Sequence, residues 1–244
     1  MRGANVADIA NSTQPVWIYV LGAANSGEAI QRFQYNSEPP YQPAGLVGST
    51  TDPTFIAANS TISGVGGVLS SFGLCQGLAC HPNGTLAASD GPVIWLFDAA
   101  TGGFAGAGAI NLSAWGNLFA YTLAFGPDGN LYVLAAPPVP SPEEAYPSGV
   151  QVLRFLSTTA IPWGVNNGNP VLITAQQLNN SGGTAMTVGG SAQAPIVYLS
   201  LTNNSPNSSP DIQTFSAPAW TAIASEFPAI EPATELISLD IVDY

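Results

Sequence analysis

The chain has 244 residues, of which 7% are charged, and 3 Lys plus Arg against 15 Asp plus Glu give a net charge of −12. Globular proteins usually carry about 25% charged residues. The scarcity of cations excludes nucleic acid as an expected partner, because few side chains could neutralise phosphates. No apolar run reaches the length of about 18 residues that a membrane-spanning helix needs. The apolar content of 46% predicts one folded domain over residues 1–244, either a whole protein or a piece of a longer chain.

Short β-branched or aromatic runs, bounded by Gly, Pro, Asn and Asp, recur along the whole sequence and predict many short strands. In chain order, the strand-rich segments are residues 17–35, 78–102, 123–157 and 196–216. Helical periodicity is scarce, and we expect only one short helix around residues 218–227. This pattern predicts an all-β protein.

Two of these segments match position by position. Residues 126–131 (GPDGNL) align with residues 81–86 (HPNGTL), and both are followed by a strand that ends in an aromatic residue. Pro-Asp-Gly and Pro-Asn-Gly favour tight turns with a positive-φ position, so each is expected to join two strands of a hairpin. Weaker copies begin at residues 17 and 196, which places the anchor strands near residues 19, 86, 131 and 196. We therefore interpret the chain as a set of repeated β-units.

The best copy, LAFGPDGNLYVL followed by VQVLRF, resembles the blades of β-propellers of the NHL-repeat, SMP-30 and strictosidine-synthase-like kind. In those families F-x-P-D-G-x-L-Y-V, followed by a strand that ends in R-F, marks a blade. The resemblance implies a β-propeller fold and specifies no activity. A double-sheet jelly roll is the competing all-β architecture.

The repeats predict four to five irregular blades, with room for a sixth around residues 45–64. The C-terminal segment, residues 235–244, resembles the strand that precedes each anchor strand. We expect it to pair with the hairpin at residues 17–35 and close the propeller within one chain. If residues 235–244 of one chain paired instead with the hairpin of the next chain, the chains would form a ring or a filament.

Asparagine sequons are more frequent than the Asn, Ser and Thr content gives by chance. Such N-x-S/T motifs accept N-linked glycans in secreted proteins. Together with the absence of lysine, they predict an extracellular location. The predicted sites are Asn11, Asn59, Asn83, Asn111, Asn179, Asn203 and Asn207.

The only cysteines, Cys75 and Cys80, lie in the segment CQGLAC. This pair predicts a small disulfide loop, which would stabilise the fold by roughly 2 kcal/mol in the chain-entropy model. Two free buried thiols are the alternative. A zinc site is a weak alternative, because the spacing is uncommon for zinc and His81 alone cannot complete four ligands.

No catalytic constellation is visible in the sequence. The only histidine, His81, is expected to be a turn residue, and the chain has no G-x-S-x-G, H-E-x-x-H or P-loop motif. Asp90, Asp98 and Asp128 lie at turns or strand ends, where a carboxylate usually caps its own backbone. Calcium is the alternative, because an acid-rich, base-poor chain suits a hard cation.

The sequence thus predicts a non-enzymatic, extracellular structural or adhesive glycoprotein. Its expected partners are further copies of itself or matrix components, and it could assemble into a fibre. Two alternatives stay open: a metal-dependent hydrolase of the lactonase type, which the family resemblance suggests, and a carbohydrate-binding module.

Overall fold

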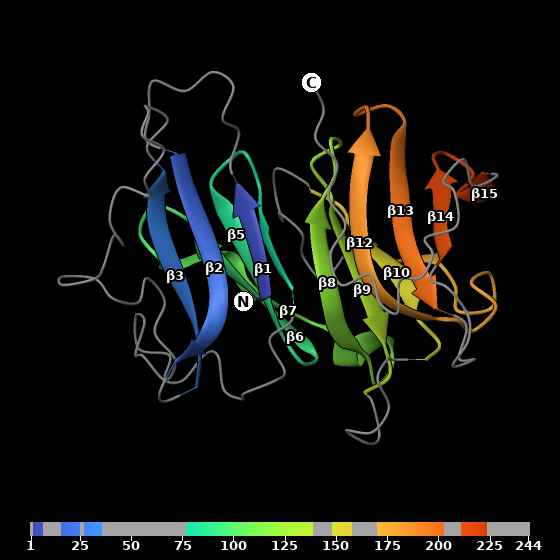
Figure 1. Cartoon of the computed structure of the whole chain (residues 1–244), viewed down its shortest axis with the longest axis horizontal. Helices are drawn as coiled ribbons and strands as arrows, with labels where there is room; N and C mark the ends of the chain where they lie inside the picture. The colour runs from blue at the N-terminus through green and yellow to red at the C-terminus, as the bar shows by residue number, and fades with distance from the viewer. Residues whose placement is uncertain are drawn as a thin grey trace. The chain divides into compact units, whose positions relative to one another are not determined.

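The computed structural model describes residues 2–6, 16–24, 27–35, 77–138, 148–157, 170–202 and 211–223. These residues are organised almost entirely as β-strands (Figure 1). The elements are β1 (Arg2–Val6), β2 (Val16–Ala24), β3 (Gly27–Tyr35), β4 (Leu78–Cys80), β5 (Thr85–Asp90), β6 (Val93–Asp98), β7 (Phe104–Asn111), the 3-10 helix η1 (Leu112–Trp115), β8 (Phe119–Phe125), β9 (Leu131–Ala136), β10 (Gln151–Phe155), β11 (Val171–Ile173), β12 (Gly182–Gly190), β13 (Pro195–Thr202), β14 (Asp211–Ser216) and β15 (Thr221–Ile223).

The strands form four separate antiparallel sheets in the described part of the chain, and each sheet pairs its strands in sequence order. We name them sheet A (β1-β2-β3), sheet C (β4-β5-β6-β7), sheet D (β8-β9-β10-β11) and sheet E (β12-β13-β14-β15). Such up-and-down sheets, mostly of four strands, are the blades from which β-propellers are built. The all-β, propeller-type fold predicted from the sequence is thereby confirmed.

The repeated turns found in the sequence have the same backbone hydrogen bonds in the structure. In sheet C the His81 N–H donates to Thr85 O and the Gly84 N–H to His81 O, at 2.8 and 2.9 Å. In sheet D the Gly126 N–H donates to Asn130 O and the Gly129 N–H to Gly126 O, both at 2.9 Å. Gly84 and Gly129 have φ values of 89° and 76°, which L side chains adopt only at a cost. The predicted alignment of the two hairpins is therefore correct in atomic detail.

The chain divides into two compact units, Met1–Asp90 with Ile94–Ala109, and Gly91–Val93 with Ile110–Tyr244. In the first unit, a core cluster joins Tyr19 and Ile30 of sheet A to Leu86 and Phe97 of sheet C. The Tyr19 hydroxyl adds a hydrogen bond of 2.9 Å to the Ala99 carbonyl. Among the described side chains, apolar packing and this long-range hydrogen bond hold sheets A and C together.

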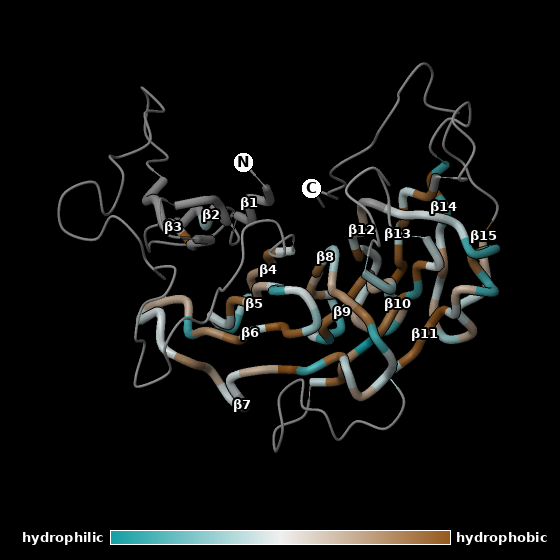
Figure 2. The backbone as a smooth tube through the Cα atoms, turned by 90° about the horizontal axis from the view of Figure 1, so that it is seen from below, coloured by the Kyte–Doolittle hydropathy of each residue, from teal (hydrophilic) through white to brown (hydrophobic). Residues whose placement is uncertain are grey.

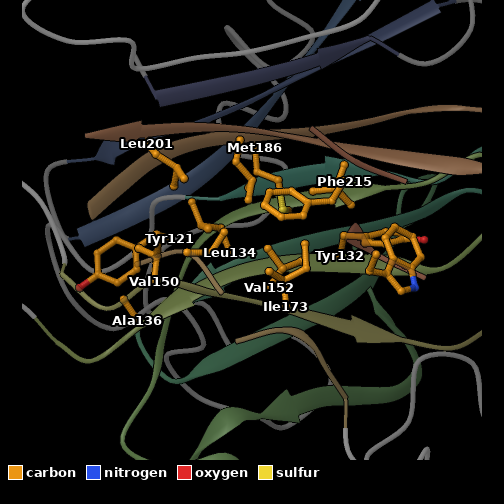
Figure 3. Packing of buried hydrophobic residues seen from close by; sticks show 14 residues of the cluster. Tyr121, Tyr132, Leu134, Ala136, Val150, Val152, Ile173, Met186, Leu201 and Phe215 are labelled. Atoms are coloured by element: carbon orange, nitrogen blue, oxygen red, sulfur yellow. The ribbon is translucent and has the colours of Figure 1, made fainter. Parts of the chain in front are cut away.

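In the second unit, sheets D and E pack face to face. Side chains alternate between the two faces of a strand, so alternate residues of β9 and β10 meet those of β12, β13 and β14. Figure 3 shows Leu134 and Val152 of sheet D among Met186 and Phe215 of sheet E. Hydrophobic segments lie along strands such as β6 and β11, as the colouring of Figure 2 shows. The cluster consists of Tyr121, Tyr132, Leu134, Ala136, Val150, Val152, Ile173, Leu178, Met186, Val197, Leu199, Leu201, Phe215 and Trp220.

The edge of β2 in sheet A differs from the sequence-based expectation. We expected residues 235–244 to pair there, but the N-terminal strand β1 occupies this edge, with Arg2 opposite Leu21 and Val6 opposite Ile18. A bulge between Arg2 and Ala4 shifts the register along this pair. Residues 235–244 lie outside the described residues, as does the segment 45–64 in which a further blade was considered.

The helix predicted around residues 218–227 is wrong over its described part. Residues 221–223 form β15 instead, with Thr221, Ala222 and Ile223 paired to β14. Two of these three residues are β-branched, which favours a strand once a sheet edge is available. Among the described residues, no helix is long and apolar enough to cross a membrane.

Candidate functional site

The turn that joins β8 to β9 arranges polar side chains around one carboxylate. Asp128 Oδ1 accepts a hydrogen bond from the Asn130 N–H at 3.2 Å, which is the capping role predicted for this residue. Asp128 Oδ2 accepts from Asn130 Nδ2 at 2.6 Å. Asn130 Oδ1 in turn accepts from the Ser157 N–H at 2.8 Å, so the turn is fixed to the end of β10.

Tyr132 extends from β9 back to the same carboxylate. Its hydroxyl donates to Asp128 Oδ2 at 2.7 Å, and its side chain is fully buried. Burial raises the pKa of Tyr132 far above its usual value, and the hydrogen bond to Asp128 and the charge of that carboxylate raise it further. The neighbouring Arg154 guanidinium opposes this shift of the pKa without reversing it. Tyr132 is therefore a protonated donor throughout the physiological pH range.

Arg154 and Trp220 complete the arrangement from two different sheets. Arg154 lies opposite Tyr132 in the β9–β10 register. Trp220 belongs to the turn between β14 and β15, and its ring centroid lies 5.2 Å from Arg154 Cζ and 6.1 Å from the ring of Tyr132. Such a cation–π contact contributes about 0.5–1 kcal/mol when exposed and more when water is excluded. We call Asp128, Asn130, Tyr132, Arg154 and Trp220 the Asp128–Arg154 cluster.

Two backbone features show how closely this cluster is packed. A Cβ atom at Gly126 would lie 2.6 Å from Asp128 Oδ1, 2.7 Å from Tyr132 Cε2 and 3.2 Å from Val188 Cγ1. Trp220 has a φ of 52°, and a bulky residue in this left-handed region costs roughly 1–2 kcal/mol. Strain of this kind persists only where the surroundings enforce it, and it is common at functional sites.

Sheet C serves as an internal reference for the cluster. Its turn has the same backbone bonds, and Asn83 Oδ1 accepts from the Thr85 N–H at 2.9 Å, as Asp128 does from Asn130. In the alignment of the two turns, however, Ala87 takes the place of Tyr132. The blade turn therefore needs neither a tyrosine hydroxyl nor a carboxylate. Sheet C thus forms its turn without these groups, whereas in sheet D Asp128, Tyr132 and Arg154 stand at the D, Y and R positions of the pattern that marks a blade.

The cluster presents hydrogen-bonding groups of both kinds at a partly exposed surface. Asp128, Asn130 and Arg154 are each half-buried, whereas Tyr132 and Trp220 beneath them are buried. A carboxylate has about four lone-pair positions. The protein fills three of those on Asp128. The Arg154 guanidinium carries five N–H donors, of which one is engaged with Tyr132 while its Cζ lies over the Trp220 ring.

The predicted glycosylation sites divide into described and undescribed residues. Asn83, Asn111 and Asn179 are exposed and lie in turns or at the end of a strand. The other predicted sites, Asn11, Asn59, Asn203 and Asn207, lie outside the described residues. Glycosylation stays a prediction at every one of them.

The predicted disulfide also remains a prediction, because Cys75 lies outside the described residues. Cys80 is half-buried at the end of β4, and its Sγ lies 3.8 Å from the His81 carbonyl oxygen. Burial raises the pKa of the Cys80 thiol to about 11. A cysteine in this environment has little thiolate character at neutral pH.

Two of the remaining candidate residues, His81 and Asp98, have the turn roles predicted for them. His81 Nδ1 accepts from the Asn83 N–H at 3.1 Å, and Asp98 Oδ1 caps the β6–β7 turn by accepting from the N–H groups of Ala100 and Thr101. Asp90 is a buried residue at the end of β5. In the described part of the chain, no three His, Cys, Asp or Glu side chains are grouped closely enough to hold a metal ion. Calcium binding stays an untested alternative.

In the sequence, Tyr132 and Arg154 were noted only as members of the blade pattern, and neither was predicted as a site residue. One signal was available, because an arginine is conspicuous in a chain with only 3 Lys plus Arg. No sequence pattern indicates that Trp220 contacts Arg154.

Comparisons with known proteins gave matches among solved structures only. No family model matches the sequence, and no curated protein matches it. An exo-1,5-alpha-L-arabinanase from a bovine ruminal metagenomic library is 12% identical with a TM-score of 0.46, over 92% of this chain and 78% of that one. A Bacillus subtilis arabinanase is 12% identical with a TM-score of 0.40, over 87% of this chain and 72% of that one. A Cellvibrio cellulosa alpha-L-arabinanase complexed with arabinohexaose is 11% identical with a TM-score of 0.39, and the same shares are covered.

These comparisons correct one prediction. The matched structures are enzymes by name, whereas we expected a non-enzymatic structural or adhesive glycoprotein, and that expectation is withdrawn. At this level of identity the likeness concerns the fold, so it assigns no residue role to this chain. None of the three carries a name of the NHL, SMP-30 or strictosidine-synthase kind.

Proposed function

We propose that the protein binds a neutral, polyhydroxylated ligand, a carbohydrate, at the Asp128–Arg154 cluster. The observation that carries the proposal is the difference between the two equivalent turns. Sheet C forms the turn with Asn83 and Ala87, whereas sheet D adds a carboxylate, a buried tyrosine and an arginine that lies over a tryptophan ring. Because sheet C forms the same turn without these groups, we infer that they have a role in sheet D besides forming the turn.

The chemistry of the cluster favours a neutral ligand. A sugar has adjacent hydroxyl groups, one of which can donate a hydrogen bond to a carboxylate while its neighbour accepts one from a guanidinium. Asp128 and Arg154 offer these two groups in one cluster. The net charge of −12 would repel an anionic ligand over most of the surface. The contact of Arg154 with Trp220 and the bonds to Asp128 also fix both groups before binding, which lowers the entropy cost of association.

The exposed sequons and the lack of lysine are consistent with an extracellular location, which we include in the proposal. Carbohydrates of cell surfaces and of the surrounding matrix would be accessible to the protein there.

Binding to immobilised neutral oligosaccharides of arabinose, glucose, galactose, mannose and xylose tests the proposal, followed by calorimetry on any that bind. The informative variants are Asp128→Asn and Arg154→Gln. Asparagine at residue 128 should keep the turn, because Asn83 forms the equivalent one. The control is Asp98→Asn, since Asp98 is another turn-capping carboxylate and no contact places it in the cluster.

We expect each cluster variant to weaken binding roughly tenfold or more, because it removes a hydrogen bond to a charged group. Asp98→Asn should bind as the wild type does, and circular dichroism should show all three variants folded. The proposal is wrong if no neutral oligosaccharide binds at millimolar concentration. It is equally wrong if binding is unaffected by both cluster variants.

A further inference from the structure

Three of the predicted glycosylation sites lie in described parts of the chain, and their local geometry differs. Asn83 is in the β4–β5 turn, Asn111 caps the 3-10 helix η1, and Asn179 lies in the turns between β11 and β12. All three side chains are exposed. Exposure alone therefore does not distinguish them.

Asn83 and Asn111 share one side-chain arrangement. The Asn83 Oδ1 accepts from the Thr85 N–H at 2.9 Å, and the Asn111 Oδ1 accepts from the Ser113 N–H at 2.9 Å. In each case the donor is the backbone of the hydroxyl residue of the same sequon. This bond fixes the rotation of the amide group, with Oδ1 turned toward the backbone and Nδ2 turned away from it. Within the described residues, neither Nδ2 atom makes a hydrogen bond that a glycan would have to break.

The repeat supplies an independent observation on Asn83. The equivalent residue in sheet D is Asp128, which forms the same turn through its Oδ1. A carboxylate has no N–H group, so the turn itself does not use the amide nitrogen. The turn therefore does not depend on any hydrogen bond from the Asn83 Nδ2 atom.

Asn179 has a different backbone. Its φ is 53°, the next residue has a φ of 54°, and its N–H donates to Gln176 O at 3.1 Å. No hydrogen bond from the Ser181 N–H to the Asn179 side chain is found, since that N–H donates to the Leu178 carbonyl at 3.0 Å. The arrangement shared by Asn83 and Asn111 is therefore lacking at Asn179.

We infer that Asn83 and Asn111 carry N-linked glycans, and that their occupancy exceeds that of Asn179. In the modification, Nδ2 attacks the anomeric carbon of an oligosaccharide held on a lipid diphosphate. A carbon–nitrogen bond forms, the bond from the anomeric carbon to the phosphate oxygen breaks, the lipid diphosphate leaves and Nδ2 loses one proton. Oδ1 takes no part, so the bonds to Thr85 and Ser113 survive with the glycan in place.

The test is site-specific mapping on the full chain secreted from eukaryotic cells. Enzymatic release of glycans in heavy-oxygen water converts each occupied asparagine to a heavy-oxygen aspartate, which peptide mass spectrometry locates. The heavy label also separates glycan release from earlier spontaneous deamidation, to which the Asn83–Gly84 pair is chemically disposed. Asn83→Asp and Asn111→Asp are the matched variants, because aspartate keeps the Oδ1 acceptor and replaces Nδ2 by a second carboxylate oxygen, as in Asp128 of the equivalent turn.

We expect heavy label at Asn83 and Asn111 in most molecules and at Asn179 in fewer. Each Asp variant should lose one glycan on a gel and keep the thermal unfolding temperature of the deglycosylated wild type. Absence of label at both Asn83 and Asn111 would overturn the inference, as would higher occupancy at Asn179 than at either. This outcome is independent of whether the Asp128–Arg154 cluster binds a carbohydrate.

Discussion

The close packing around Gly126 leads to our sharpest prediction, for the variant Gly126→Ala. The added methyl group would lie 2.6 Å from Asp128 Oδ1 and 2.7 Å from Tyr132 Cε2. Real Cβ atoms do not come so close to other atoms, so these groups must move. Tyr132 cannot yield easily, because it is fully buried and packs against Trp220. Overpacking of this kind typically costs about 1–3 kcal/mol, and we expect a loss in that range.

Urea unfolding, followed by far-ultraviolet circular dichroism, measures this loss as a lower midpoint at an unchanged slope. The matched control is Gly103→Ala, whose new Cβ would meet only Thr101 Oγ1 at 3.5 Å, without a positive φ. That variant should be neutral or slightly more stable, by about 0.4–1 kcal/mol, because alanine restricts the unfolded chain. If Gly126→Ala is as stable as Gly103→Ala, the described packing of the cluster is incorrect.

Three further predictions concern the core and the titrating groups. Phe215→Ala should destabilise the protein by about 3–5 kcal/mol in urea unfolding, because the ring is almost fully buried between sheets D and E; a loss below about 1 kcal/mol would contradict that packing. Ordinary tyrosines ionise at about pH 10, and Tyr132 should stay protonated there in an ultraviolet titration. The variant Tyr132→Phe should therefore show the same change in tyrosine absorbance near that pH as the wild type. Because the folded-state pKa is raised, the stability that this tyrosine contributes is complete below about pH 10 and is lost as the pH rises toward the folded-state value. The hydrogen bonds from Thr101 lower the pKa of Asp98, so its contribution is present above about pH 4 and is lost as the pH falls through the folded-state pKa; a nuclear magnetic resonance titration that shows Asp98 with an ordinary pKa would refute this.

The repeat pattern predicted the middle strands of the sheets. The anchor strands expected near residues 19, 86, 131 and 196 are β2, β5, β9 and β13, each the second strand of its sheet. These strands were visible because turn residues flank them and because their apolar runs are long. The outer strands β11 and β15 have only 3 residues each, and pairing with a neighbour rather than local propensity defines them.

Only part of the candidate site could be predicted from the sequence. Asp128 is placed by its turn motif, and Tyr132 follows at a spacing that lets it reach back over the turn. Trp220 contacts Arg154 only because sheet E packs on sheet D, and no local pattern encodes that contact. At the edge of β2, the repeat pattern suggested residues 235–244, whereas β1 is the strand that pairs there.

The division of the chain into its two units has a consequence for synthesis on the ribosome. The backbone leaves the first unit after Asp90, returns at Ile94 and leaves again after Ala109, so neither unit is one continuous stretch. The carbonyl oxygens of Gly91 and Pro92 accept hydrogen bonds from the N–H groups of Ala120 and Leu112, which are translated later. A nascent chain that stops near residue 109 therefore exposes a turn whose partners do not yet exist. Expression of residues 1–109 alone should yield a product prone to aggregation, whereas a boundary placed beyond Ala120 retains these two bonds.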